Sequence, residues 1–129
     1  MLSVPGSLKI FIAVEAVDFR KSHDGLAAIV EQAIGEDLFG GGLFVFTNKR
    51  RDRLKILYWD SDGLALWYKR LEAGTFRLPR ANNDATRLEI SAADLNLILS
   101  GIELSSVKRR KRYRRPEPAK NPSEQTPVA

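Results

Sequence analysis

The chain has 129 residues, of which 43% are hydrophobic and 29% are charged, with no cysteine and one histidine, His23. This length accommodates one ordinary domain and a tail, and the composition excludes a disulfide framework, a thiolate zinc site and a cysteine nucleophile. No run approaches the roughly 20 apolar residues that a membrane helix needs, and the first seven residues lack the pattern of a secretory signal, so we expect a cytoplasmic protein without a membrane partner.

The net charge of +5 is concentrated in one short segment. Residues 1–107 contain 13 Lys and Arg against 14 Asp and Glu, whereas residues 108–115 carry seven positive charges. Such a run repels itself, and the Pro-rich stretch after it has almost nothing apolar to bury. We therefore predict a single α+β domain over residues 1–105 and a disordered basic, Pro-rich tail over residues 106–129.

The spacing of apolar residues predicts a strand and then a helix in the first part of the chain. Residues 9–14 form an apolar, β-rich run and predict a buried strand. Apolar residues then recur at helical spacing from residue 23 to residue 34, and Gly35 supplies the expected stop. Ser22 or Asp24 is the candidate N-cap of this helix.

A hairpin is predicted in the middle of the chain. Residues 43–46 and 53–59 read as strands, and the loop 48–52 is short enough to join them in an antiparallel pair. Apolar residues occupy both faces of these strands. We therefore expect them to lie centrally in the sheet, covered by the helix.

The segment 64–71 is ambiguous. Its apolar residues fit either a helix face or the alternation of a strand, and we favour a strand because the turn 60–63 invites a hairpin. Ser91 then opens a second predicted helix, with apolar residues on one face up to Ile102. The predicted fold class is α+β, a small antiparallel sheet packed by one or two helices.

A series of short motifs between residues 7 and 102 carries a family resemblance. Six of them occur in order, and the block from Trp67 to Glu72 is the specific one. The six motifs are Asp18-Phe19-Arg20-Lys21, Asp24-Gly25-Leu26, Leu43-Phe44-Val45-Phe46, Arg51-Asp52-Arg53-Leu54-Lys55, Tyr58-Trp59-Asp60-Ser61-Asp62-Gly63 and Trp67-Tyr68-Lys69-Arg70-Leu71-Glu72. The chain thus resembles TnpB, the Orf2-type accessory protein of the bacterial insertion-sequence family numbered sixty-six, which is unrelated to the RNA-guided nucleases of the same name.

The resemblance implies a non-catalytic helper in transposition that acts with a separate, larger transposase. Two features depart from the family pattern. His23 stands where members usually carry an apolar residue, which argues against essential histidine chemistry. The basic run after residue 107 lies outside the shared pattern, so a DNA-binding role for the tail does not follow from the family.

The candidate binding residues are basic. The predicted hairpin tip is rich in cations that can contact nucleic-acid phosphates, and in a strand Arg51, Arg53 and Lys55 would project on one side as a basic edge. The alternative is a solvated turn whose charges discourage edge pairing. The full predicted nucleic-acid-binding set is Arg20, Lys21, Lys49, Arg50, Arg51, Arg53, Lys55, Lys69, Arg70, Lys108, Arg109, Arg110, Lys111, Arg112, Arg114 and Arg115.

Several of these assignments have plain structural alternatives. Arg20 and Lys21 either join a phosphate-binding surface or lie beside an Asp18 that pairs with Arg20 or caps the helix. Lys69 and Arg70 either extend the basic face or are ordinary surface charges. The basic tail binds any polyanion, and its Tyr113 can stack on a base, or it serves only as a solubilising tail.

The acidic residues near position 60 have two interpretations, a metal-dependent nuclease site and a tight turn, and the turn is favoured. Asp60 and Asp62 have the spacing of two magnesium ligands, with Asp18 or Asp24 as a third oxygen donor. The same Asp-Ser-Asp-Gly sequence is typical of a tight turn in which Gly63 takes a positive φ. We therefore predict no catalytic residue, no metal and no cofactor.

Two functions from different classes remain. The first is an accessory subunit that binds DNA, in this context the insertion-sequence ends, through backbone phosphates and assists the transposase of the same element. The second is a protein–protein adaptor of the transposase complex that does not touch DNA. The modest charge of residues 1–107 favours the second function, and the two dense basic segments favour the first.

Overall fold

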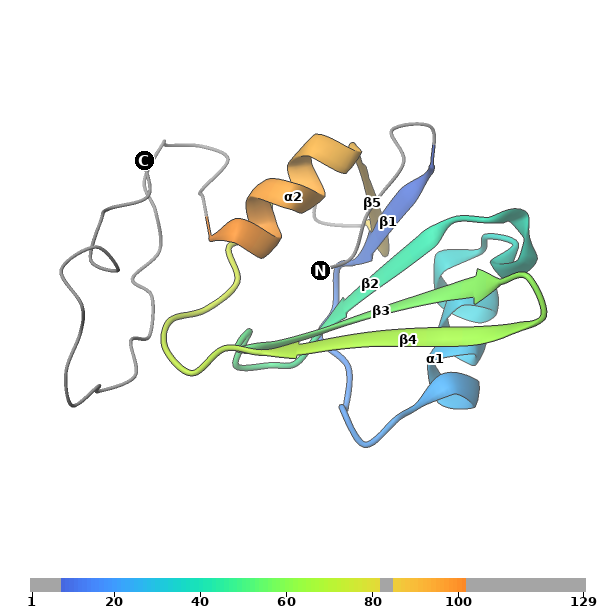
Figure 1. Cartoon of the computed structure of the whole chain (residues 1–129), viewed down its shortest axis with the longest axis horizontal. Helices are drawn as coiled ribbons and strands as arrows, with labels where there is room; N and C mark the ends of the chain where they lie inside the picture. The colour runs from blue at the N-terminus through green and yellow to red at the C-terminus, as the bar shows by residue number, and fades with distance from the viewer. Residues whose placement is uncertain (1–7, 82–84, 102–129) are drawn as a thin grey trace, which may run out of the picture.

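The computed structural model describes residues 8–81 and 85–101 (Figure 1). The predicted tail over 106–129, the domain boundary before it and the last helical position, Ile102, lie outside the described residues. In chain order the elements are β1 (Ile10–Ala13), α1 (His23–Ile29), the π-helical turn η1 (Val30–Ile34), the 3-10 turn η2 (Leu38–Gly40), β2 (Leu43–Thr47), β3 (Arg53–Asp60), β4 (Gly63–Arg70), β5 (Arg87–Ile90) and α2 (Ala92–Ser100).

The five strands form one sheet in the order β4-β3-β2-β1-β5. The α+β class is confirmed, but the sheet is mixed because β1 and β2 pair in parallel, with Ile10 opposite Leu43. The chain leaves β1, crosses through α1 and returns beside β1 as β2, and such a crossover makes the two strands parallel. The other three pairs are antiparallel.

Both predicted hairpins are present. Thr47 pairs with Leu54 in the β2–β3 hairpin, so the loop 48–52 closes it as expected. The ambiguous segment 64–71 is largely strand β4, which confirms the strand interpretation. At its turn, Ser61 rather than Gly63 adopts the positive φ, at 56°, and the Asp62 N–H donates to the Asp60 carbonyl at 2.5 Å. The expectation for Gly63 was wrong because the positive φ falls two residues earlier, at Ser61, the middle residue of a three-residue turn.

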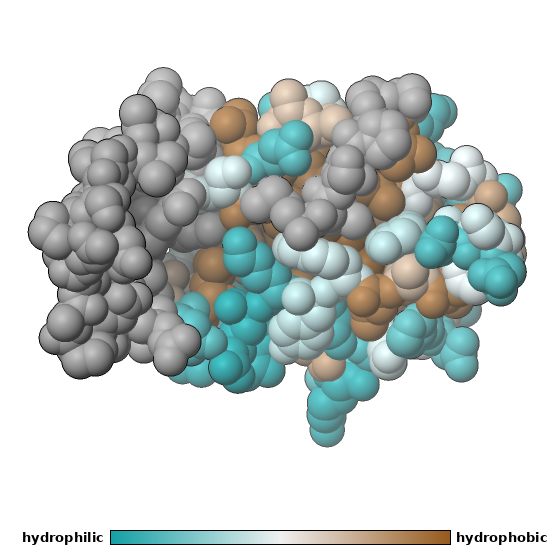
Figure 2. Space-filling model, viewed as in Figure 1, coloured by the Kyte–Doolittle hydropathy of each residue, from teal (hydrophilic) through white to brown (hydrophobic). Residues whose placement is uncertain are grey.

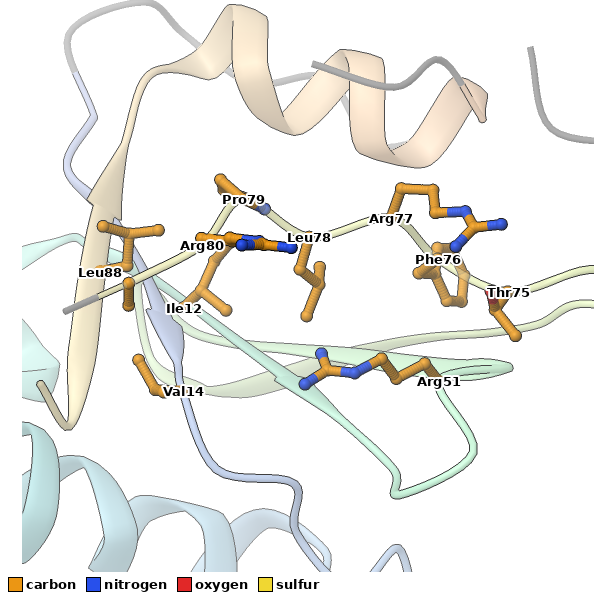
Figure 3. A pocket seen from close by; sticks show the side chains of 11 residues that line it. Ile12, Val14, Arg51, Thr75, Phe76, Arg77, Leu78, Pro79, Arg80 and Leu88 are labelled. Carbon is orange, nitrogen blue, oxygen red and sulfur yellow. The ribbon is translucent and has the colours of Figure 1, made fainter. Parts of the chain in front are cut away.

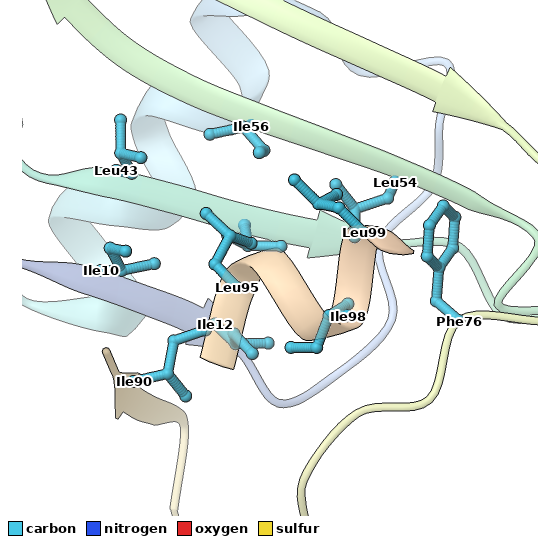
Figure 4. Packing of buried hydrophobic residues seen from close by; sticks show 11 residues of the cluster. Ile10, Ile12, Leu43, Leu54, Ile56, Phe76, Ile90, Leu95, Ile98 and Leu99 are labelled. Carbon is cyan, nitrogen blue, oxygen red and sulfur yellow. The ribbon is translucent and has the colours of Figure 1, made fainter. Parts of the chain in front are cut away.

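The central strands are buried on both faces, as their composition predicted. On one face aliphatic side chains of the sheet pack against α2 and Phe76 (Figure 4). On the other face the phenylalanines Phe11, Phe44 and Phe46 pack against α1, η1 and η2. Alternation along each strand sends neighbouring residues to opposite layers, so a single short strand supplies both cores.

The helix ends follow from local chemistry. The helical stretch that starts at His23 ends at Gly35, which takes a left-handed φ of 75° where a residue with a Cβ would be strained. The Ser22 side chain makes no capping hydrogen bond, whereas the Ser91 hydroxyl accepts one from the Asp94 N–H at 3.1 Å. In the part of the chain that is described, neither helix has the length and apolarity to cross a membrane.

Candidate nucleic-acid interface

Two basic segments meet at one end of the sheet. The Leu71 N–H donates to the Asp52 carbonyl and the Phe76 N–H to the Arg51 carbonyl, both at 2.7 Å, so the chain after β4 lies against the β2–β3 loop. The stretches 48–53 and 69–81 contain two acidic residues, Asp52 and Glu72, against eight cations. These eight, which we call the basic end, are Lys49, Arg50, Arg51, Arg53, Lys69, Arg70, Arg77 and Arg80.

The β2–β3 loop is held by its own side chains. The Asn48 amide donates to the Asp52 carboxylate at 2.6 Å and accepts from the Arg53 N–H at 3.0 Å. The hydrogen bond from Asn48, with the charges of Arg50 and Arg53, lowers the pKa of Asp52 despite partial desolvation. Arg51 takes a positive φ of 58° in this loop. The cations are thus presented by an ordered turn rather than by a loose one.

A groove of about 410 Å³ runs between this loop and the sheet edge near β1 and β5 (Figure 3). Arg51 and Arg80 extend towards apolar side chains such as Ile12 and Leu78, whereas Arg77 extends the other way. The residues that line the groove are Ile12, Val14, Arg51, Thr75, Phe76, Arg77, Leu78, Pro79, Arg80, Ala81 and Leu88. No carboxylate is among them, and guanidinium groups suit bidentate contact with phosphate, so this groove is chemically suited to an anion.

Arg51 and Arg80 are the groove arginines that have no ion-pair partner among the described residues. Within residues 8–81 and 85–101, no carboxylate lies at ion-pair distance from either guanidinium. Sequence reasoning predicted Arg51 but missed Arg77 and Arg80. The available signal was the segment Thr75–Arg80, which carries two arginines, an aromatic residue and a proline without any acidic residue.

Lys55 does not belong to an exposed basic edge, and that part of the prediction was wrong. Its side chain is only 5% exposed, and its ammonium donates to the carbonyls of Phe19 and Lys21 at 2.9 and 2.8 Å. The same ammonium lies 4.8 Å from the Phe19 ring centre and 5.2 Å from that of Tyr68. Burial lowers the pKa of Lys55. Because β3 is covered on both faces, a lysine at its centre anchors the loop before α1 to the sheet instead of facing solvent.

The remaining strand cations share an end of the sheet but not a face. Arg53 lies directly opposite Arg70, a like-charge pair that is unfavourable on its own. Arg70 is compensated by Glu72, whose carboxylate lies 2.9 Å from the Arg70 guanidinium. Strand alternation puts Lys69 on the other face, where its ammonium donates to the Leu99 carbonyl at 3.3 Å.

Arg20 and Lys21 precede α1, in the loop that Lys55 anchors. Asp18 pairs with Arg20, with oxygen and nitrogen 2.6 Å apart, so the ion-pair alternative holds rather than the helix cap. The side-chain hydrogen bond from Arg20, followed by that from the Arg20 backbone, lowers the pKa of Asp18 to about 2. The Arg20 side chain is 91% exposed despite the pair, and Lys21 is exposed as well.

Asp60 and Asp62 are exposed residues of the β3–β4 turn. In the described part of the chain no three His, Cys, Asp or Glu side chains gather as a metal site would require. The turn itself accounts for this pair of aspartates, as the sequence interpretation favoured.

Among residues 8–81 and 85–101, large aromatic side chains reach the surface at two places. Tyr68 of β4 is 45% exposed, and its ring lies edge-on to Phe19 with 5.8 Å between centres. Phe39 of η2 is 60% exposed and lies edge-on to Trp59 at 4.8 Å. On the face seen in Figure 2, hydrophilic residues gather along the lower edge and apolar ones appear between them in small patches.

The fold and this surface define a small α+β protein with a cationic end. The model of the family described as "IS66 Orf2 like protein" matches residues 8–109. The chain belongs to this family, which supplies accessory proteins of IS66 transposition. The resemblance inferred from the six motifs is confirmed.

Two curated relatives come from Sinorhizobium fredii (strain NBRC 101917 / NGR234). The uncharacterized protein y4jC is 38% identical over 110 residues, which cover 85% of this chain and 92% of the relative. The uncharacterized protein y4hO is 34% identical over 103 residues, which cover 80% of this chain and 88% of the relative. No solved structure matches the chain.

Proposed function

We propose that the chain is a non-catalytic transposition accessory protein that binds nucleic acid by its backbone phosphates and thereby assists a separate transposase. The observation that carries the proposal is the groove at the basic end, where Arg51 and Arg80 extend over apolar side chains and no carboxylate of the described residues lies at ion-pair distance. Guanidinium groups in such a setting displace counterions from a phosphate backbone. The family context supplies the partner enzyme, and the basic tail over residues 108–115 adds a second polyanion contact.

The charge distribution supports contact without base readout. Arginine side chains that reach phosphates fix the position of a duplex but carry no sequence information. Arg20, Lys21, Lys49, Arg50 and Arg53 supply further exposed or half-exposed cations around the groove or on the neighbouring loop. Lys55 is excluded from this set because its ammonium is occupied by two carbonyl groups.

The test is the salt dependence of duplex affinity for the full chain and single-charge variants. Each phosphate contact contributes about 0.9 to the slope of log affinity against log salt. We expect Arg51→Gln and Arg80→Gln each to flatten the slope by about that amount. The matched control is Lys9→Gln, which removes one exposed charge beside the start of β1, at the opposite end of the sheet from the β2–β3 loop.

The outcomes separate the groove from the tail. Equal slopes for the two arginine variants and Lys9→Gln contradict the groove as a phosphate site. If neutralising residues 108–115 alone abolishes binding, the folded domain makes no contact of its own. If the unmodified chain shows no salt-dependent affinity for duplex or single-stranded DNA, the whole proposal fails.

A protein–protein adaptor is the second candidate, and the Phe39–Trp59 pair favours it. An aromatic residue that is 60% exposed beside a tryptophan is typical of an interaction hot spot. We expect Phe39→Ser to weaken capture of the co-expressed transposase by the full chain after nuclease treatment, while Arg51→Gln leaves that capture intact. Equal capture by both variants contradicts a role for this pair.

A further inference from the structure

Tyr68 combines exposure, rigidity and cationic surroundings in a way that no other described aromatic residue does. It lies on the edge strand β4, and 45% of its surface is open to solvent. The other large exposed aromatic residue in the described part, Phe39, lies on a 3-10 turn beside Asp37. An exposed ring on a regular strand loses little conformational freedom when a ligand binds to it.

Contacts with Lys55 and Phe19 hold the Tyr68 ring in position. Lys55 is its direct cross-strand partner, and the Lys55 ammonium lies over the Tyr68 ring at 5.2 Å from its centre. Phe19 meets the same ring edge-on at 5.8 Å. Lys55 is in turn bonded to the carbonyls of Phe19 and Lys21, so strand, loop and ring form one support.

Cations surround this support, two of them in exposed ion pairs, Arg20 with Asp18 and Arg70 with Glu72. Arg70 is two residues along β4 on the same face as Tyr68, and Arg53 lies opposite Arg70 on β3. Arg20 and Lys21 belong to the loop that Lys55 anchors, and both are exposed. A flat ring with positive charges on two sides fits a planar group joined to phosphates, which is the chemistry of a nucleotide.

We propose that Tyr68 is a stacking platform for an unpaired nucleotide base, with phosphate contacts from Arg53 and Arg70. The occupant is single-stranded nucleic acid or an unpaired strand end, because bases inside a duplex have no free face to offer. This inference rests on the proposed function, since it assigns the single-stranded class of ligand to a surface adjoining the same basic end.

The experiment compares two probes with equal numbers of phosphates, an oligodeoxyadenylate and an abasic oligonucleotide, by fluorescence anisotropy. All chains are full length and carry Tyr113→Leu, so that the tail offers no ring of its own. The background chain is expected to bind the base-bearing probe about 5- to 10-fold more tightly than the abasic one, the lower range for one stacked base. Tyr68→Phe is expected to retain this preference and Tyr68→Leu to abolish it with unchanged abasic affinity.

Tyr58→Leu is the matched control, because it removes a tyrosine from the other face of the sheet. Thermal unfolding followed by circular dichroism verifies that each variant is folded. The inference is overturned if the background chain binds both probes equally, if the preference survives Tyr68→Leu, or if Tyr58→Leu or Tyr68→Phe removes it. If neither probe binds while the chain still binds duplex DNA, the inference is overturned and the proposed function stands. If duplex DNA is not bound either, the proposed function itself fails, so the two failures are distinguishable.

Discussion

Replacing Lys55 by methionine tests whether this buried ammonium anchors the loop before α1. The change keeps a long unbranched side chain but removes two charge-assisted hydrogen bonds, at 2.9 and 2.8 Å, and two ring contacts. Each hydrogen bond is worth about 1.5 kcal/mol and each ring contact about 0.5 kcal/mol. Methionine avoids the desolvation cost of the ammonium, which offsets roughly half of that loss. We therefore expect the free energy of unfolding to fall by about 2 kcal/mol.

The assay is urea unfolding followed by tryptophan fluorescence, since Trp59 and Trp67 lie on β3 and β4. Lys49→Met is the matched control, because Lys49 is exposed in the β2–β3 loop and its replacement should change the stability by less than about 0.5 kcal/mol. Amide exchange of residues 18–22 should accelerate in Lys55→Met alone. Equal stability of the two variants, with unchanged exchange in the loop, would refute the anchoring role.

A comparison of the unmodified chain with Lys55→Met also predicts how the stability depends on pH, and in which direction. Burial lowers the pKa of Lys55 below its ordinary value of 10.5, so the folded chain releases this proton at a lower pH than the unfolded chain. In the window below 10.5 the unfolded chain therefore binds more protons, and stability rises with pH. We expect the unfolding free energy of the unmodified chain to rise relative to Lys55→Met across that window. A constant or shrinking difference contradicts the sign.

Three further predictions concern single groups. The Thr47 hydroxyl is buried without a hydrogen-bond partner among the described residues, so Thr47→Val should raise the free energy of unfolding by about 1 kcal/mol in urea, while Thr47→Ser should not. Arg20→Gln should raise the pKa of Asp18 from about 2 towards 3.8 in a carboxylate NMR titration, because the main cause of the lowering is removed. In the unmodified chain the contribution of Asp18 to stability is present above pH 3.8 and is lost as the pH falls through about 2; an unchanged pKa in Arg20→Gln contradicts the ion pair. Gly35→Ala should lower the stability by about 1 kcal/mol, measured by thermal unfolding, because the left-handed φ of 75° strains a residue with a Cβ even though nothing lies within 4 Å of it.

Local signals in the sequence were sufficient for most of the elements. Alternation and apolar runs predicted β1, β2, β3 and, with more ambiguity, β4, while Gly35 and Ser91 predicted a helix end and a helix start. These signals work because a turn, a cap or a strand edge is decided by a few neighbouring residues. The family motifs were also local, and the family they indicated is confirmed.

Strand order could not be predicted in the same way. The parallel pairing of β1 with β2, and the addition of β5 beyond β1, join segments that are far apart in the chain. Pairing between such strands is decided by the burial of both sheet faces at once, which no short window of sequence contains.

For the candidate site, Lys55 and the groove show which properties the sequence alone decides and which depend on the tertiary structure. The sequence itself determined that the chain is rich in cations near the β2–β3 loop and that β3 is apolar on both faces. Only the tertiary structure decided that Lys55 is buried. It also decided that Arg80 lines the same groove as Arg51, although the two residues are 29 positions apart in the chain. The physical reason is that the exposure of a charge depends on which distant segments cover it, and those segments are chosen by the packing of the whole sheet rather than by the residues beside the charge.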